Sequence, residues 1–108
     1  MNLEISPAEL RTRREEGEEI VVLDCRTEVE RKIAQIDNSI HAPLAELQAM
    51  LQELLEYAEK TVVVHCHHGV RSLQATTYLR EEGFTKAFSL AGGIDRWSLE
   101  IDTSIPRY

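Results

Sequence analysis

The sequence predicts an α/β domain with a parallel sheet that is covered by helices on both faces. First, segments with a strand pattern alternate with segments of helical pattern along the chain, and the connections between them are short. Second, residues 61–64 form an unbroken β-branched run, which is typical of a strand buried on both faces of a parallel sheet. Third, a length of 108 residues suits a single core. We therefore expect residues 1–108 to form one domain.

The first quarter of the chain predicts an edge strand, a helix and a second strand. Residues 3–5 form the edge strand. Residues 6–9 open the helix, because they supply a capping box and a proline at the first helical position. The helix ends at about Glu16. Residues 20–25 then form a strand that is apolar until Asp24.

The middle of the chain predicts two helices separated by a brief strand. Residues 27–30 form another capping box and open a short helix with Val29 and Ile33 on its inner face. Residues 39–42 form the brief strand. Residues 44–59 predict the longest helix, because apolar residues recur along one stripe that is expected to pack in the core: Leu44, Leu47, Leu51, Leu54 and Ala58.

The second half predicts a strand, a very short turn, a helix and a final strand–turn–helix unit. Four residues after the turn recur at helical spacing: Ser72, Ala75, Thr76 and Leu79. Gly83 and Phe84 supply a Schellman ending for this helix. Residues 86–90 form the last strand, and residues 92–93 turn the chain into a short helix. The tail, residues 102–108, is expected to lie extended on the surface.

The turn after residues 61–64 contains the candidate catalytic residues. Its sequence from residue 66 to residue 71 is CHHGVR. So short a connection forces the backbone into a tight arc, where successive N–H groups converge beside the N-terminus of the helix. Cys66 starts this arc, so we expect a lowered thiol pKa and a nucleophile that works near neutral pH. Gly69 permits the backbone angles of the arc, and Arg71 offers a planar, permanently charged fork to an anionic group.

The segment CHHGVRS, residues 66–72, resembles the active-site loop of the rhodanese family of sulfurtransferases. Residues 22–26, VLDCR, are similar to the family's strand that ends in Asp-x-Arg. Residues 90–94, LAGGI, together with Trp97 are similar to its final strand and turn. The resemblance covers essentially the whole chain, although residues 34–39 lack the family's Gly-His-Ile-Pro-Gly-Ala-like stretch. It implies a single rhodanese-like domain, α/β with a five-stranded parallel sheet in the strand order 1-5-4-2-3.

The resemblance also implies a mechanism in which Cys66 is the catalytic nucleophile. Its thiolate takes a sulfane sulfur from thiosulfate or another small anionic donor, and the Cys66 persulfide passes that sulfur to a thiol, cyanide or a protein acceptor. Asp24 and Arg26 are expected to form a supporting charge pair that holds neighbouring loops, and a direct substrate role for Arg26 stays open. No metal and no organic cofactor is required. The residues expected to bind the substrate follow the nucleophile: His67, His68, Gly69, Val70, Arg71 and Ser72.

Four other interpretations of the loop stay open. Cys66 can be an inert, buried cysteine. A metal site built from residues 65–68 is a second reading, although the segment lacks CxxC and HxxxH spacing. A phosphatase or arsenate reductase is a third, because residues 65–66 and 71–72 also bracket the loop of cysteine-dependent phosphatases. The fourth is a relay module whose persulfide serves a partner such as a ubiquitin-like sulfur carrier, since residues 101–108 resemble the tails of rhodanese domains fused to carrier-activating enzymes.

Composition limits the partners and the compartment. A formal net charge of −7 argues against nucleic acid and anionic membranes as partners. The N-terminal residues carry no secretory signal pattern and no apolar run approaches membrane-spanning length, so we expect a cytoplasmic protein. Two cysteines are no disulfide framework. Cys25 is expected to point into the core, and it can form a disulfide with Cys66 if the two lie at the ends of neighbouring strands.

Overall fold

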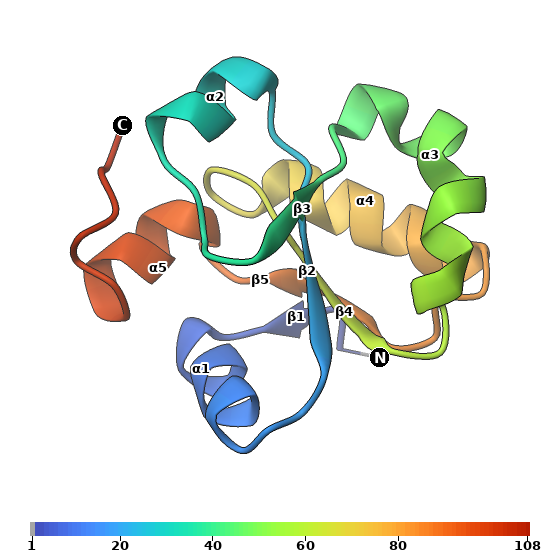
Figure 1. The fold of residues 1–108 in the computed structure, drawn as a ribbon, viewed down its shortest axis with the longest axis horizontal. Coiled ribbons are helices and arrows are strands. Elements are labelled where there is room, and N and C mark those ends of the chain that lie inside the picture. The colour runs from blue at the N-terminus through green and yellow to red at the C-terminus, as the bar shows by residue number, and fades with distance from the viewer. Residues whose placement is uncertain (1) are drawn as a thin grey trace.

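The computed structural model describes residues 2–108, and within that range it shows one five-stranded parallel sheet between two layers of helices (Figure 1). Numbered along the chain, the strands lie in the order 1-5-4-2-3, which confirms the topology that the family resemblance implies. Every residue of the central strand, Thr61–His65, is buried, as the β-branched run at residues 61–64 predicts. The strands are β1 (Glu4–Ile5), β2 (Ile20–Asp24), β3 (Ser39–His41), β4 (Thr61–His65) and β5 (Ala87–Leu90).

Helices cover both faces of the sheet, and each face has its own apolar core (Figure 1). The α3/α4 core contains Leu23, Cys25, Val64, Cys66 and Leu79, and the α1/α5 core contains Ile5, Leu10, Val63, Ile94 and Trp97. The helical segments are α1 (Pro7–Glu15), α2 (Glu28–Ile33), η1 (Leu44–Glu46), α3 (Leu47–Leu54), η2 (Leu55–Tyr57), α4 (Val70–Glu81) and α5 (Gly93–Glu100).

The single long helix predicted for residues 44–59 is wrong. Three short helices, η1, α3 and η2, occupy this range, and α4 is the longest helix within residues 2–108. The three segments follow one another without a gap, and the first and last turns, η1 and η2, are tightened to 3₁₀ helices. The apolar stripe itself is confirmed: Leu47 and Leu54 are buried, and Leu44, Leu51 and Ala58 pack against the same core.

The inner face predicted for α2 is also wrong, although its capping box is present. Val29 is 71% exposed and Ile33 is 44% exposed. The helix lies over the carboxyl edge of the sheet rather than on an apolar core. Its polar side chains therefore turn inward: Glu30 accepts hydrogen bonds from Arg71, and Arg31 donates to the buried carboxylate of Asp24.

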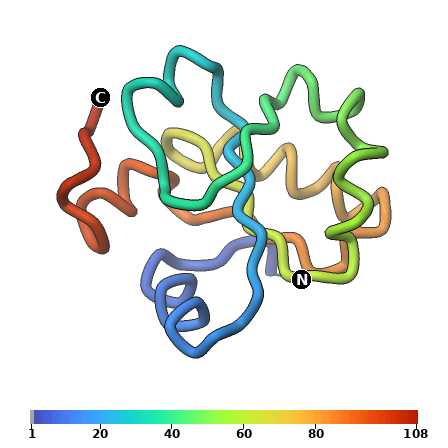
Figure 2. The backbone as a smooth tube through the Cα atoms, in the orientation of Figure 1, coloured from blue at the N-terminus to red at the C-terminus, as the bar shows by residue number. Residues whose placement is uncertain are grey.

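The C-terminal tail differs from the extended surface segment that the sequence predicts. Figure 2 shows the tail, drawn in red, running back beside the segment that carries α2. Ile105 is buried in the α1/α5 core, and the guanidinium of Arg107 donates to Asp95 over 2.9 Å. Tyr108 reaches Arg26, two residues after the end of β2, and Glu30 of α2.

Asp24 and Arg26 form a buried ion pair at the carboxyl end of β2, and both side chains are fully buried. Nε and Nη2 of Arg26 each donate to one carboxylate oxygen of Asp24 over 2.8 Å. Nη2 also donates to the Ala34 carbonyl over 2.6 Å, and Arg31 donates to Asp24 over 3.1 Å. The pair therefore joins the end of β2 to the last turn and the C-terminal end of α2.

None of the helices in the part of the chain described, from residue 2 onward, is both long enough and apolar enough to cross a membrane.

We predict that Asp24→Asn lowers the free energy of unfolding by about 3–5 kcal/mol, because it leaves the Arg26 charge buried without its carboxylate. Urea denaturation measures this change. The matched control is Glu9→Gln, which breaks an exposed ion pair with Arg13 and is expected to cost less than about 1 kcal/mol. Equal losses in the two variants would contradict the structural role of the buried pair.

Candidate active site

Cys66 lies directly after β4 and almost out of contact with solvent, at 1% exposure. The amide of Gly69 donates to its Sγ over 3.0 Å and the amide of Ser72 over 3.4 Å. The hydroxyl of Ser72 lies 3.5 Å from Sγ and 2.7 Å from the hydroxyl of Ser89. The loop and the first turn of α4 thus converge on one sulfur atom, as the sequence predicts.

Close backbone contact with α5 fixes the shape of this loop. Gly69, which caps α4, has φ +104°, a conformation that glycine adopts readily. The amides of Ile94 and Asp95 at the start of α5 donate to the carbonyls of Cys66 and His67 over 2.9 and 3.2 Å. A Cβ at Gly93 would lie 2.4 Å from the His67 carbonyl oxygen, so no side chain fits there. The sequence indicated only a turn at this position.

Two buried thiols shift each other's pKa in opposite directions. The hydrogen bond from the Cys25 thiol is the largest cause of a Cys66 pKa far below its ordinary value, and the Ser72 hydroxyl and the amides of Ser72 and Gly69 lower it further. Burial opposes this effect. The hydrogen bond to Cys66, burial and the nearby charge of Cys66 raise the pKa of Cys25. Cys66 is therefore the thiolate of the pair, and Cys25 keeps its proton.

Arg71 leaves the first turn of α4 and is held by Glu30, which sequence reasoning identified only as a helix-capping residue. The guanidinium donates to both carboxylate oxygens over 2.6 and 2.8 Å. This bidentate pair lowers the pKa of Glu30 and raises that of Arg71. The positive charge of Arg71, which we expected to bind the substrate, is thus partly balanced by the carboxylate of Glu30.

Tyr108, at the end of the C-terminal tail, joins the hydrogen-bond network of Glu30 and Arg26. The sequence alone did not place it near the site. Its hydroxyl donates to Glu30 over 2.7 Å and accepts from Arg26 over 3.0 Å. Burial raises the pKa of Tyr108 to about 12, so the hydroxyl stays protonated and keeps its donor role. Its ring also stacks on His67, with centroids 3.9 Å apart and planes 7° apart.

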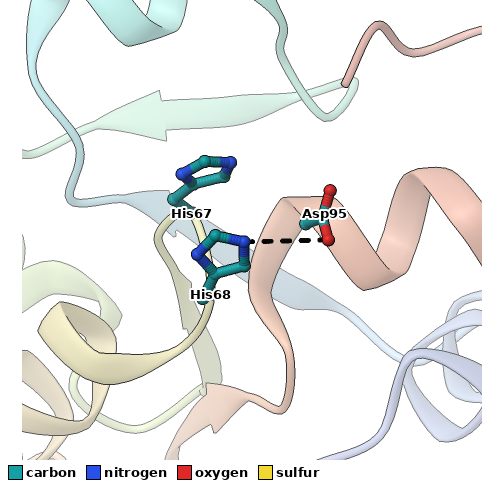
Figure 3. A group of neighbouring side chains, drawn as sticks. All are labelled: His67, His68 and Asp95. Atoms are coloured by element: carbon teal, nitrogen blue, oxygen red, sulfur yellow. Dashed lines mark ion pairs between the residues drawn. The ribbon is translucent and has the colours of Figure 1, made fainter. Parts of the chain in front are cut away.

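The two loop histidines point toward α5 and the tail (Figure 3). His67 stacks between Tyr108 and His68, and Nε2 of His68 lies 3.7 Å from a carboxylate oxygen of Asp95. The two imidazoles and Asp95 each offer one ligand atom within 4.8 Å of the others, which makes them the candidate metal ligands among residues 2–108. Two hydrogen bonds from Arg107 already engage this carboxylate.

His65 does not join that group. Its side chain is fully buried, and within the described residues neither ring nitrogen has a hydrogen-bond partner. Burial lowers its pKa to about 4, so the ring is neutral at physiological pH. The metal site considered for residues 65–68 is therefore not assembled as a unit.

A cavity of about 310 Å³ lies next to Cys25, which forms part of its wall together with Arg71. The remaining wall comes from Arg26, Thr27, Pro43, Leu44 and Ala45. Val70 faces elsewhere: its side chain is 75% exposed and lines an apolar groove along α4. Of the predicted substrate-binding residues, Gly69 and Ser72 contact Sγ directly and Arg71 borders the cavity, whereas His67 and His68 lie toward α5.

Comparison with known proteins gives a consistent picture. The family model described as a rhodanese-like domain matches residues 6–100. The chain is 34% identical over 86 residues to a thiosulfate sulfurtransferase, GlpE, of Coxiella burnetii, a match that covers 80% of this chain and 78% of that protein. It is 32% identical over 127 residues to the adenylyltransferase and sulfurtransferase MOCS3 of Arabidopsis thaliana, covering 98% of this chain but only 27% of that much longer protein.

A solved structure shares the fold along nearly its whole length. The rhodanese-related protein from Thermoplasma volcanium superimposes with a TM-score of 0.81 at 32% identity, covering 91% of this chain and 92% of that one.

We predict that Cys66 titrates well below the ordinary thiol pKa of about 8.5. The ultraviolet absorbance of the thiolate, taken as the difference between the wild type and Cys66→Ser, measures this directly. Ser72→Ala removes one hydrogen-bond donor and is expected to move the midpoint upward, whereas Thr77→Ala on the exposed side of α4 is expected to leave it unchanged. A wild-type midpoint at the ordinary value would contradict the stabilised thiolate.

Proposed function

This chain belongs to the rhodanese-like domain family, and from that premise we propose that it is a sulfurtransferase that carries a sulfane sulfur on Cys66. The donor is thiosulfate or another small anion with a sulfane sulfur, and the acceptor is a thiol, cyanide or a protein. One observation carries the proposal: amides of the loop and of the first turn of α4 donate to the sulfur of Cys66.

The first half-reaction loads the sulfur. The Cys66 thiolate attacks the outer sulfur of thiosulfate, and the sulfur–sulfur bond of the donor breaks. Sulfite leaves with the electron pair of that bond, and Cys66 becomes a persulfide. The low pKa of Cys66 supports this step because the nucleophile is already deprotonated.

The second half-reaction transfers the outer sulfur of the persulfide to the acceptor. A thiolate or cyanide attacks the outer sulfur of the persulfide, and the Cys66 thiolate leaves. The same donors that stabilise the free thiolate, the amides of Gly69 and Ser72, stabilise it as a leaving group. No cofactor takes part in either step.

Arg71 is proposed to orient the anionic end of the donor. Its side chain borders the cavity next to Cys25, and its bidentate pair with Glu30 fixes the guanidinium plane. Since Glu30 balances part of the charge, the contribution of Arg71 is orientation more than long-range attraction. This fits a molecule whose net charge of −7 repels anions at a distance.

The proposal predicts which thiol is essential. Mixed with equimolar thiosulfate, the wild type and Cys25→Ser are expected to release one equivalent of sulfite, while Cys66→Ser releases none. Sulfite is measured colorimetrically, and circular dichroism confirms that each variant is folded. Retention of sulfite release by Cys66→Ser, together with its loss in Cys25→Ser, would show that the nucleophile has been assigned to the wrong cysteine.

A further inference from the structure

Cys25 and Cys66 lie side by side at the carboxyl ends of neighbouring parallel strands. Asp24 of β2 pairs with His65 of β4, and the Cys25 amide donates to the His65 carbonyl over 3.0 Å, which extends the pairing by one residue. Paired strands lie roughly 4.8 Å apart. Disulfides span Cα separations of roughly 4.4–6.8 Å. The two backbones are therefore at disulfide spacing.

Their side chains also point to the same face of the sheet. Side chains alternate along a strand, so Cys25 shares the face of Leu23 and Cys66 shares the face of Val64. All four residues belong to the α3/α4 core, and both cysteines are free thiols. Their interaction lowers the pKa of Cys66 and raises that of Cys25.

Cys25 is more than a packing residue, because it also borders a cavity. It lies in the wall of the 310 Å³ cavity together with Arg71, whose positive charge favours the thiolate form of Cys25. A sulfur atom added to Cys66 thus has a second thiol beside it.

We propose that Cys25 is a resolving thiol and that this protein also releases sulfide, consuming an external dithiol. This inference rests on the proposed function, since it starts from the Cys66 persulfide. The sulfur of Cys25 attacks Sγ of Cys66, and the bond between Sγ and the outer sulfur breaks. The outer sulfur leaves with that electron pair, takes the proton of Cys25 and departs as HS⁻. The sulfane sulfur is reduced to sulfide, and the two cysteines are oxidised to a disulfide.

An external dithiol completes the cycle by reducing the disulfide between Cys25 and Cys66. For thiosulfate as donor, one thiosulfate and one dithiol yield one sulfite, one HS⁻, one proton and one oxidised dithiol. The disulfide form cannot accept sulfur, because it has no free thiolate. Sulfide release is therefore limited by the supply of dithiol, and an external sulfur acceptor competes with Cys25 for the persulfide.

Loading the sulfur itself changes the state of Cys25. Before loading, the hydrogen bond to Cys66, burial and the charge on the Cys66 thiolate keep the proton on Cys25. After loading, Sγ of Cys66 carries no full charge and accepts that hydrogen bond less well. The charge on Arg71 remains. Cys25 is thereby changed from a hydrogen-bond donor into a nucleophile at the moment when a target sulfur becomes available.

The test is a single turnover without any free thiol. Reduced wild type and Cys25→Ser are mixed with equimolar thiosulfate, and sulfite, sulfide and the intact protein mass are measured at the endpoint. For the wild type we expect equal amounts of sulfite and sulfide and a mass lower by two hydrogens, with peptide mapping joining Cys25 to Cys66. For Cys25→Ser we expect slower loading, because the Cys25 thiol helps to stabilise the Cys66 thiolate. At the endpoint we expect one equivalent of sulfite, no sulfide and a mass higher by one sulfur atom.

Two outcomes would overturn the inference, and they are distinguishable. If the wild type releases sulfite but keeps the added sulfur as Cys25→Ser does, Cys25 is not a resolving thiol and the proposed function stands. If the wild type releases no sulfite, the proposed function fails with thiosulfate and the inference fails with it. Cys25→Ala provides the same readout without a serine hydroxyl, should Cys25→Ser fold poorly.

Discussion

The buried ion pair between Asp24 and Arg26 is the constraint on which the site depends. It fixes the end of β2, where Cys25 stands between the two charged residues. Through its remaining donors, Arg26 also holds α2 and the hydroxyl of Tyr108. Tyr108 in turn contacts Glu30, the partner of Arg71, so one continuous set of hydrogen bonds runs from the buried pair to the cavity wall. Buried charges are costly unless they are fully paired, and this requirement leaves the surrounding elements few alternative positions.

Local patterns predicted most of the fold and the centre of the site. The β-branched residues 61–64 identified the central strand, and the glycine and Phe84 after α4 marked the end of that helix, where the Phe84 amide donates to Leu79. The strand order required the family resemblance, because periodicity carries no information on which strands pair. Helical periodicity found the buried face of residues 44–58 but not the 3₁₀ turns at its two ends. The spacing of the apolar residues does not depend on whether the backbone forms a 3₁₀ helix or an α-helix.

The parts of the site that sequence reasoning missed join residues far apart in the chain. Glu30 and Arg71 are separated by 41 positions, and Arg26 and Tyr108 by 82. Capping preference fully explains a glutamate at position 30, so no local signal pointed to its second role. The glycine pair at 92–93 was the one readable clue, because two successive glycines at the start of a helix allow another backbone to approach. In the structure that backbone is the Cys66 loop.

We infer that the Cys66 loop suits a sulfur atom rather than a phosphoryl group. Four residues separate Cys66 from Arg71, one fewer than in the cysteine phosphatases that the loop resembles. A phosphoryl group needs donors for three peripheral oxygens, and a shorter arc supplies fewer amides. The most direct measurement compares two activities of one preparation: sulfur transfer from thiosulfate to cyanide, and hydrolysis of p-nitrophenyl phosphate. We expect sulfur transfer that depends on Cys66 and phosphatase activity no higher than that of Cys66→Ser. Phosphatase activity that depends on Cys66, without sulfur transfer, would contradict the account.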